Sequence, residues 1–256
     1  MIDAAGVTLL ITHFNRPKSL QRLLAALQEL GCTFAETLVS DDGSSAETLV
    51  RLQELQREYS FRLITAAVNK GLQNNLNRGL DLVRTEYTLY VQEDFCPTAQ
   101  FAKNLGNAVA ILDERKDVDI VRMYAYVKYP YLKHWKDGYS EMDFSLWRPG
   151  SAKFFCYSDT PHLRRKSFFQ KFGRYVEGLP AIKGEKRMVM SFLQSQGKAL
   201  VCEVNDSFIH ENSDTEPSTQ DYGAFLRLKR LIPETVFDLL WTAKLTCEYV
   251  FKRYRN

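Results

Sequence analysis

A repeated alternation of apolar strand-like segments and amphipathic helix patterns constrains the fold of this chain more than any other feature. The first segment, residues 7–12, is almost wholly apolar, as expected of a strand that is buried on both faces. A helix pattern follows, in which four leucines share one face. Further strands are predicted over residues 34–40, 61–67, 87–91 and 119–123. This alternation predicts an α/β domain with a mostly parallel central sheet and helices on both faces.

Polar turns follow four of these strands. Residues 13–16 read His-Phe-Asn-Arg, 41–44 read Asp-Asp-Gly-Ser, 69–71 read Asn-Lys-Gly and 92–94 read Gln-Glu-Asp. Because the carboxyl ends of parallel strands lie on one edge of a sheet, we expect the four turns to converge. One such turn is usually explained by helix capping. Four turns on one edge instead indicate a ligand site.

The turn at 41–44 suits a nucleoside. Asp41 and Asp42 can accept hydrogen bonds from a base or from ribose hydroxyls. Gly43 allows a positive φ and the close approach of a flat ring. Phe14, in the first turn, can stack on that ring.

Charged residues in the other turns suit a diphosphate. Arg16, Lys70 and Arg78 offer cations to phosphate oxygens. Glu93 and Asp94 are adjacent acids directly after a strand, and such a pair can hold a divalent cation that in turn holds a diphosphate. The alternative is an acidic turn that only caps the next helix.

Composition excludes several classes of protein. The net charge of the 256 residues is only +3, too low for a nucleic-acid-binding surface. The five cysteines are widely spaced and form no CxxC pair, which argues against a disulfide framework or a zinc site. No apolar run reaches the roughly 18 residues of a membrane span, and no signal-peptide pattern opens the chain. We therefore expect a cytoplasmic protein.

The order of these motifs resembles that of family 2 glycosyltransferases, which adopt the GT-A nucleotide-sugar fold. The resemblance rests on Thr12-His-Phe-Asn-Arg-Pro17, Asp41-Asp-Gly-Ser44, Asn69-Lys-Gly-Leu72, Asn77-Arg-Gly79 and Gln92-Glu-Asp94. It is strong over residues 7–125 and looser to about His210. It implies a single GT-A domain over 1–215, with a nucleotide-binding half (1–123) and a smaller acceptor half (124–215). Residues 216–256 would form a helical extension.

The resemblance implies a donor site for a nucleotide sugar. In the family, Thr12, Phe14, Asp41 and Asp42 would hold the base and ribose, and Glu93 would be a ribose-side contact. The full set of residues expected at the donor is Thr12, Phe14, Asn15, Arg16, Asp41, Asp42, Gly43, Asn69, Lys70, Gly71, Arg78, Gln92 and Glu93.

The resemblance also implies a divalent metal, Mn²⁺ or Mg²⁺, with Asp94 as a ligand. His210 stands where many GT-A enzymes place a further metal or diphosphate contact, although a lone histidine is more often structural. The chain departs from the common pattern at Gln92, where most members have an acid. Since Mg²⁺ usually keeps several waters and one or two carboxylates, Asp94 with water and phosphate oxygens suffices.

The segment 124–150 is irregular and rich in aromatic residues. Trp135, Tyr139 and Trp147 suit stacking on an acceptor sugar, and packing over the sheet is an equal alternative. A strand is predicted over 151–157 and a short helix over 166–172.

An inverting transfer requires a carboxylate that takes the proton of the acceptor hydroxyl. The family places an acid pair at the start of a helix, here the helix predicted over 188–196. Glu185 is the predicted base and Glu177 the reserve, while Lys186 stands in place of the second acid. A glutamate at a helix start can also simply complement the helix dipole.

The end of the chain is predicted to hold a polar loop over 211–222, which can act as a lid, and helices around Pro233. The last helix has an apolar stripe and a basic end. It can lie on the inner face of a membrane or dock on the domain or on a second subunit, and we favour docking. The oligomeric state is not predicted.

These features together predict an inverting glycosyltransferase. It would move a sugar to a hydroxyl of a glycan or lipid-linked acceptor, as in surface polysaccharide synthesis. The resemblance to the family implies that the donor is a UDP-sugar. One alternative is a nucleotide-sugar-binding protein of the same fold with impaired catalysis, prompted by Gln92 and Lys186. The other is a nucleotidyltransferase, which would carry a glycine-rich basic loop where this chain has residues 13–17.

Overall fold

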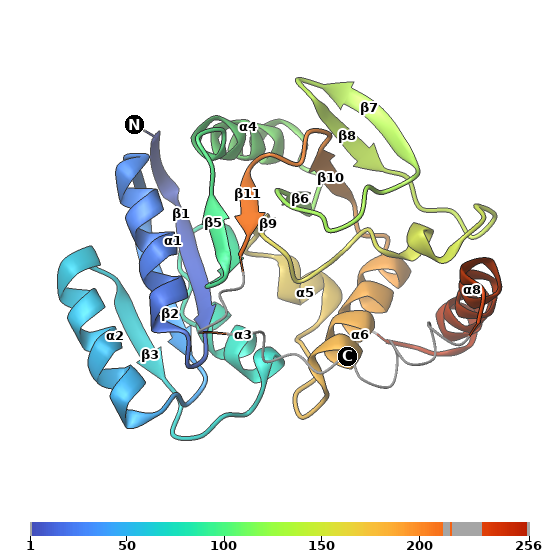
Figure 1. The fold of residues 1–256 in the computed structure, drawn as a ribbon. Helices are drawn as coiled ribbons and strands as arrows, with labels where there is room; N and C mark the ends of the chain where they lie inside the picture. Colours follow the sequence, from blue (N-terminus) through green and yellow to red (C-terminus); the bar gives the residue numbers. More distant parts are fainter. Residues whose placement is uncertain (1, 212–215, 217–231, 255–256) are drawn as a thin grey trace.

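The computed structural model describes residues 2–211, 216 and 232–254 (Figure 1). The strands are β1 (Ile2–His13), β2 (Cys32–Asp41), β3 (Arg62–Thr65), β4 (Tyr87–Gln92), β5 (Phe95–Pro97), β6 (Ile120–Arg122), β7 (Leu132–Lys136), β8 (Tyr139–Met142), β9 (His162–Arg165), β10 (Ala199–Cys202) and β11 (Phe208–His210). The helices are α1 (Pro17–Glu29), α2 (Ala46–Tyr59), α3 (Leu72–Leu80), α4 (Phe101–Glu114), α5 (Phe168–Phe172), α6 (Ala181–Gln194) and α8 (Glu234–Phe251), with a 3-10 helix, η1 (Ser151–Phe154).

The central sheet has the strand order β3-β2-β1-β4-β9-β6-β10-β8-β7. The pairs within β3-β2-β1-β4 are parallel, as the alternation predicts. Beyond β4 the sheet becomes mixed, because β9 runs antiparallel to both β4 and β6. This reversal places the start of β9 on the same edge as the ends of β4 and β6. β5 and β11 form a separate two-stranded sheet.

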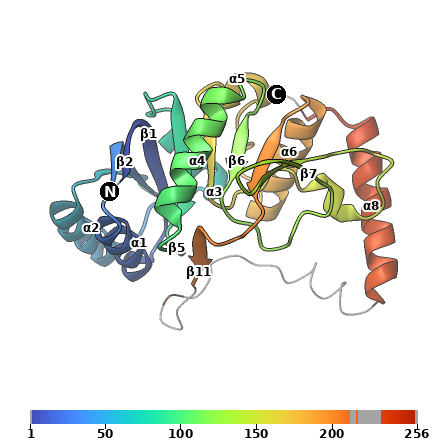
Figure 2. The ribbon, with the colours of Figure 1, turned by 90° about the horizontal axis from the view of Figure 1, so that it is seen from above.

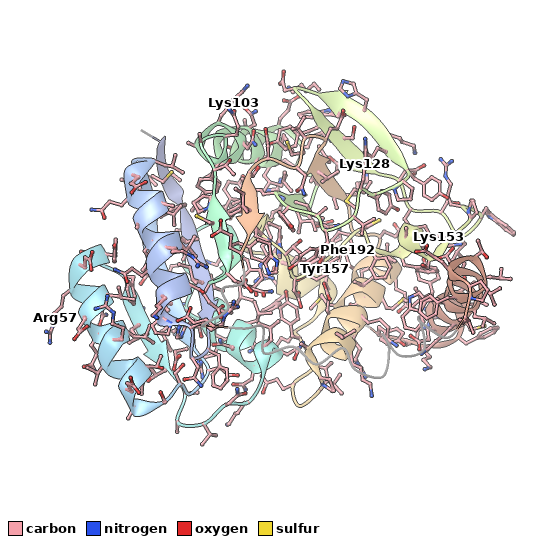
Figure 3. All side chains as sticks on the ribbon, in the orientation of Figure 1. Arg57, Lys103, Lys128, Lys153, Tyr157 and Phe192 are labelled. Carbon is pink, nitrogen blue, oxygen red and sulfur yellow. The ribbon has the colours of Figure 1, made fainter. Side chains whose placement is uncertain are left out.

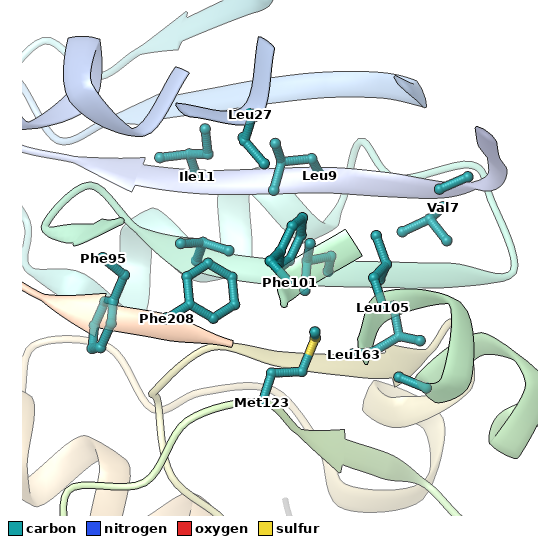
Figure 4. Close-up of a cluster of buried hydrophobic side chains, with 14 of the residues drawn as sticks. Val7, Leu9, Ile11, Leu27, Phe95, Phe101, Leu105, Met123, Leu163 and Phe208 are labelled. Atoms are coloured by element: carbon teal, nitrogen blue, oxygen red, sulfur yellow. The ribbon is translucent and has the colours of Figure 1, made fainter. Parts of the chain in front are cut away.

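The alternation of side chains along β1 divides the core into two layers. Leu9 and Ile11 point into a cluster with α1, α2 and α4, whereas Leu10 points into a cluster with α3, α5 and α6 (Figure 4 shows the first cluster). Helices therefore cover both faces of the sheet, as predicted (Figure 2). In the second cluster, Tyr157 packs against Phe192 with ring centroids 5.9 Å apart (Figure 3).

Two predictions about secondary structure are wrong. Residues 151–157 form no strand: η1 occupies their first half, and burial of Lys153, Phe154, Cys156 and Tyr157 around an exposed Phe155 does not alternate as in a strand facing water on one side. The irregular segment 124–150 also contains a hairpin, β7–β8, which sequence reasoning missed.

Helix α6 begins at Ala181, earlier than the predicted start at 188, so that Glu185 lies in its second turn. The tail helix is α8, and its inner residues Trp241, Leu245 and Tyr249 pack on the second core cluster. Of the predicted loop over 211–222, only Glu211 and Glu216 are described, so the proposed lid lies outside the described residues. Among the described helices, none is long and apolar enough to cross a membrane.

Candidate active site

A cavity of about 400 Å³ lies at the carboxyl edge of β1, β2 and β4. The strand register brings the ends together, with Thr12 opposite Gln92 and His13 opposite Asp41. The predicted donor and metal residues that line the cavity are Thr12, Phe14, Arg16, Asp42, Asn69, Gly71, Gln92, Glu93 and Asp94. The cavity wall also includes residues 179–182, at and before the start of α6, which sequence reasoning did not assign to the donor.

Asp41 holds the turns at residues 13–16 and 41–44 together through hydrogen bonds beside the cavity. Its Oδ1 accepts a hydrogen bond from His13 Nδ1 at 2.8 Å, and its Oδ2 accepts one from the Ser44 backbone N–H at 3.0 Å. Because His13 Nε2 accepts the Arg16 backbone N–H, the imidazole proton lies on Nδ1. Asp41 is fully buried, and its carboxylate therefore orders the turns rather than facing the cavity.

Asp42 joins the second and third turns and lines the cavity. Its carboxylate accepts hydrogen bonds from the backbone N–H groups of Lys70 at 3.1 Å and Gly71 at 2.7 Å. Gly43 makes this approach possible, because a Cβ at that position would lie 2.5 Å from the carbonyl carbon of Val68. Burial raises the pKa of Asp42 above its usual value, despite the two backbone hydrogen bonds.

Besides Asp41 and Gly43, three further predicted donor residues do not line the cavity. Lys70 is exposed outside it. Arg78 lies beneath the sheet edge, where its Nη2 donates to Asn75 Oδ1 at 2.8 Å and to the Asp41 carbonyl. Asn15 has a φ of 52° and accepts the Ser45 backbone N–H through its side chain. In this conformation these residues shape the turns rather than present groups to a donor.

Arg16, Glu93, Asp94 and His210 form an acidic corner at one end of the cavity. Arg16 Nη1 donates to Asp94 Oδ2 at 2.7 Å and lies 3.7 Å from Glu93 Oε1. His210 Nε2 donates to the same Asp94 oxygen at 3.2 Å. Sequence reasoning placed these residues at the site, and the structure brings them into direct contact.

The pKa values of the two carboxyl groups in this corner are shifted in opposite directions. Burial, together with the neighbouring charge of Asp94, raises the pKa of Glu93 to about 8. Burial alone would also raise the pKa of Asp94, but the hydrogen bonds from His210 and Arg16 outweigh it and hold this pKa below its usual value. Asp94 is therefore the ionised member of the pair.

Asp94 retains one buried oxygen, Oδ1, that has no hydrogen-bond partner among the described residues. His210 and Asp94 are the only predicted metal ligands in contact, and no group of three or more His, Cys, Asp or Glu side chains suited to a metal occurs within the described part of the chain. The described residues thus supply at most two ligands here, a number that suits a cation completed by water and phosphate oxygens.

A second cavity, of about 560 Å³, adjoins the first. The two cavities share four residues of their walls: Leu72, Gln92, Ala181 and Ile182. The second is walled by the segment after β6, by the loop before β9, by α6 and by Phe237 and Trp241 of α8. Since Trp241 and Phe237 come from the tail, no local sequence signal connected them with this site.

Glu185, the predicted base, lines the second cavity. Its Oε1 accepts hydrogen bonds from Ser158 Oγ at 2.7 Å and from the Asp159 backbone N–H at 3.0 Å. Among the described residues, Oε2 accepts no hydrogen bond. Glu177, the reserve, has both oxygens held by Asn74 and Asn77 and lines neither cavity.

Asp159 is a second acid in this cavity, and sequence reasoning missed it. Its Oδ1 accepts the hydroxyl of Tyr157 at 2.7 Å, while Oδ2 is buried without a partner among the described residues. Burial and the charge of Glu185 raise the pKa of Asp159 to about 7. Gln92 Nε2 donates to the carbonyl of Asp159 at 2.9 Å and so links the two cavities directly.

The predicted acceptor residues lie elsewhere. The prediction that Tyr139 contacts the acceptor is wrong. Its side chain is only 1% exposed and lies in the core, and its hydroxyl donates to the Asn104 carbonyl, so that the ring offers no face to a sugar. Trp135 is half-buried on β7 beneath Lys136, and Trp147 is 96% exposed on a loop. Neither tryptophan lines a cavity.

Lys186, which stands where the family resemblance places a second acid, lines neither cavity. Its Nζ forms an ion pair with Glu248 of α8 at 2.8 Å. The residue therefore joins α6 to α8, and the missing acid is not replaced at that position.

A parallel first half of the sheet, a mixed second half and a cavity at the shared strand edge are the features of the GT-A class of glycosyltransferase fold. Solved structures with this fold include S. aureus TarS in complex with UDP-GlcNAc, with a TM-score of 0.60, 15% identity and coverage of 95% of this chain and 71% of that chain. Another is the mannosyltransferase PcManGT from Pyrobaculum calidifontis in complex with GDP-Man and Mn²⁺, with a TM-score of 0.55, 14% identity and coverage of 93% and 63%.

The family model described as glycosyl transferase family 2 matches residues 8–173, more than half of the chain. The chain belongs to this family of glycosyltransferases. A poly-beta-1,6-N-acetyl-D-glucosamine synthase from Staphylococcus epidermidis is 27% identical over 89 residues, which cover 35% of this chain and 22% of the synthase. The chain therefore matches only about a fifth of the length of that curated relative.

Proposed function

We propose that the chain transfers a sugar from a nucleotide-sugar donor in the first cavity to an acceptor hydroxyl in the second. The observation that carries this proposal is the shared wall of the two cavities at Leu72, Gln92, Ala181 and Ile182, with Glu185 on the acceptor side. A sugar at this junction has its nucleotide in one cavity and its acceptor in the other.

The proposed donor is a UDP-sugar, with UDP-GlcNAc the first to test. The support comes from relatives, since TarS is solved with UDP-GlcNAc and with UDP, and the curated match is a synthase of an N-acetylglucosamine polymer. Phe14 and Asp42 of the cavity wall would hold the base and ribose, with Thr12 and Asn69 beside them. Arg16 supplies positive charge at the diphosphate end.

The acidic corner fits a divalent metal, Mn²⁺ or Mg²⁺. Asp94 would hold it through Oδ1, and His210 would assist. When bound, such a cation neutralises the charge that develops on the leaving nucleoside diphosphate. The support is the buried, unpartnered oxygen of an acid whose pKa is held low, together with Mn²⁺ in the structure of PcManGT.

Glu185 would act as the general base of an inverting transfer. The acceptor oxygen attacks the anomeric carbon, its proton passes to Glu185 Oε2, and the electrons of the broken C–O bond leave with the nucleoside diphosphate. Ser158 and the Asp159 backbone hold Oε1, which fixes the orientation of the carboxylate. The charge of Asp159 would change how readily Glu185 accepts this proton.

The acceptor would be a glycan or a lipid-linked saccharide in surface polysaccharide synthesis, at the cytoplasmic side of a membrane. The domain limits proposed are a GT-A domain over 1–215 and an extension over 216–256. The ion pair of Lys186 with Glu248 favours a second candidate function, a nucleotide-sugar-binding protein with impaired catalysis, because the family's second acid is absent.

Thermal unfolding with a panel of nucleotide sugars tests the donor, because a ligand that binds only the folded state raises the melting temperature. We expect UDP and UDP-GlcNAc to raise it in the presence of Mn²⁺, and no effect of any nucleotide would reject the donor site. Release of UDP from a stabilising donor then separates the enzyme from the binding protein.

A further inference from the structure

The face of α8 that points away from the domain is apolar. It comprises Val236, Leu239, Leu240, Val250 and Phe251, and Leu239 and Phe251 are 69% and 82% exposed. These residues recur at helical spacing along the 18 residues of α8. We call them the outer face of α8. The inner face is apolar as well, and a helix that is apolar on both sides is normally buried on both. Helix α8 lies at one end of the molecule and α2 at the other (Figures 1 and 2).

The inner face of α8 is already used by the domain. Phe237 and Leu245 are buried, and Phe237 and Trp241 wall the second cavity. The ion pair of Lys186 with Glu248 and the hydrogen bond from Ser151 Oγ to Asp238 Oδ1 at 2.5 Å fix the orientation of the helix. The outer face therefore cannot turn inward without losing these contacts.

The charges beside the outer face are basic toward the carboxyl end of α8. Lys244, Lys252 and Arg253 are exposed there. Glu248 is buried, and both its oxygens lie near lysine nitrogens. An apolar helix face bordered by basic side chains is the pattern of a helix that lies in the plane of an anionic membrane surface.

Trp147 adds an exposed aromatic ring close to α8. Trp147 lies between two contacts with α8 along the chain. The Phe144 ring lies 5.2 Å from the Tyr249 ring, and the Ser151 backbone N–H donates to Asp238 Oδ1. At 96% exposure Trp147 contributes nothing to the core. Tryptophan is the residue type enriched at membrane–water interfaces.

We propose that the outer face of α8 docks on an anionic lipid bilayer. Its role rests on the proposed function: the same helix would hold the second cavity next to the membrane, where a lipid-linked acceptor is presented. A second copy of the chain is the competing occupant. The exposed basic side chains at the end of α8 complement an anionic surface, whereas a second copy would present the same positive charges.

The test is co-sedimentation of the full chain with phosphatidylcholine vesicles, with and without phosphatidylglycerol. We expect binding to the anionic vesicles, and at least a tenfold loss in the double variant Leu239→Glu with Phe251→Glu. Val50→Glu is the matched control, because Val50 is 57% exposed on the distant α2, and its binding should be unchanged. Lys244→Gln with Arg253→Gln should weaken binding to anionic vesicles selectively.

Absence of vesicle binding by the wild-type chain would overturn the proposal, as would a wild-type dimer in light scattering that Leu239→Glu converts to a monomer. Calorimetry with UDP keeps this result separate from the proposed function. Docking without UDP binding would reject the donor site alone, whereas UDP binding without docking would reject the membrane surface alone.

Discussion

Arg16 Nη1 donates to Asp94 Oδ2 at 2.7 Å, so the cation predicted for the diphosphate and the acid predicted for the metal are partners in this structure. The pair neutralises a buried carboxylate that would otherwise be costly to ionise. It also leaves Asp94 Oδ1 for a metal ion. A bound diphosphate would then find Arg16 and the metal on the same side of the cavity.

Asp94→Asn should remove metal-dependent donor binding. The amide keeps the shape of the side chain but lacks the charge, so we expect at least about a hundredfold lower rate of UDP release. Calorimetric titration of Mn²⁺ in the presence of UDP measures the binding directly. Wild-type affinity in this variant would exclude Asp94 as the ligand.

Glu185→Gln should lower kcat roughly 10²- to 10⁴-fold, the usual contribution of a general base. Glutamine can still accept the hydrogen bonds from Ser158 and Asp159, so the affinity for the donor should stay unchanged. Steady-state kinetics with donor and acceptor separates the two effects. Glu177→Gln serves as the control, since Glu177 lines neither cavity. A greater loss of kcat in Glu177→Gln than in Glu185→Gln would identify Glu177 as the base instead.

Asp159→Asn should alter the pH dependence of transfer. Since the pKa of Asp159 is raised to about 7, the group changes charge beside Glu185 within the working range, and the wild-type rate should change through this pH. Asparagine can still accept the Tyr157 hydroxyl but does not titrate. If the rate of the variant changes near neutral pH in the same way as that of the wild type, Asp159 is not the group that titrates.

Trp241→Ala should raise the KM for the acceptor about tenfold, the loss expected for one aromatic contact. Trp135→Ala is the matched control, because Trp135 lines neither cavity. Kinetics at saturating donor compares the two variants. The reverse ranking would restore the acceptor role that sequence reasoning gave to Trp135.

His162→Asn should make the protein less sensitive to acid. Burial lowers the pKa of His162 to about 3, and Nδ1–H donates to the Thr160 carbonyl at 2.7 Å. Below its usual pKa the histidine takes up a proton only when the chain unfolds, so folding stability falls as the pH falls. Between neutral pH and about pH 4 this costs roughly 3 kcal/mol.

Asparagine at this position can still donate to the Thr160 carbonyl but does not titrate. Urea unfolding at the two pH values should therefore show a smaller acid loss for the variant than for the wild type. An equal loss in both proteins would show that other groups cause it.

The parallel first half of the fold was predictable because its signals are local. Alternation along β1 and the polar turns at Asp42 and Asp94 follow from neighbouring residues and from the rule that parallel strands share an edge. The β7–β8 hairpin also has a local signal, because Asp137 and Gly138 both adopt positive φ, as Asp-Gly does in a two-residue turn.

The second cavity was not predictable from the sequence. Asp159 lies at the site because β9, which follows it, runs antiparallel to β4, and no sequence motif predicts this reversal of strand direction. Trp241 reaches it because α8 docks on α6 through Lys186 and Glu248, which are 62 positions apart in the chain. Such long-range pairings are decided by packing rather than by local patterns.

Release of UDP from UDP-GlcNAc, measured with Mn²⁺ and an acceptor glycan, tests the central claim most directly. We predict that the wild-type chain releases UDP and forms a glycosylated product, and that Asp94→Asn and Glu185→Gln each lower the rate of transfer at least about a hundredfold. Tight binding of UDP by the wild type with no release from any nucleotide sugar would contradict the account and identify a binding protein instead.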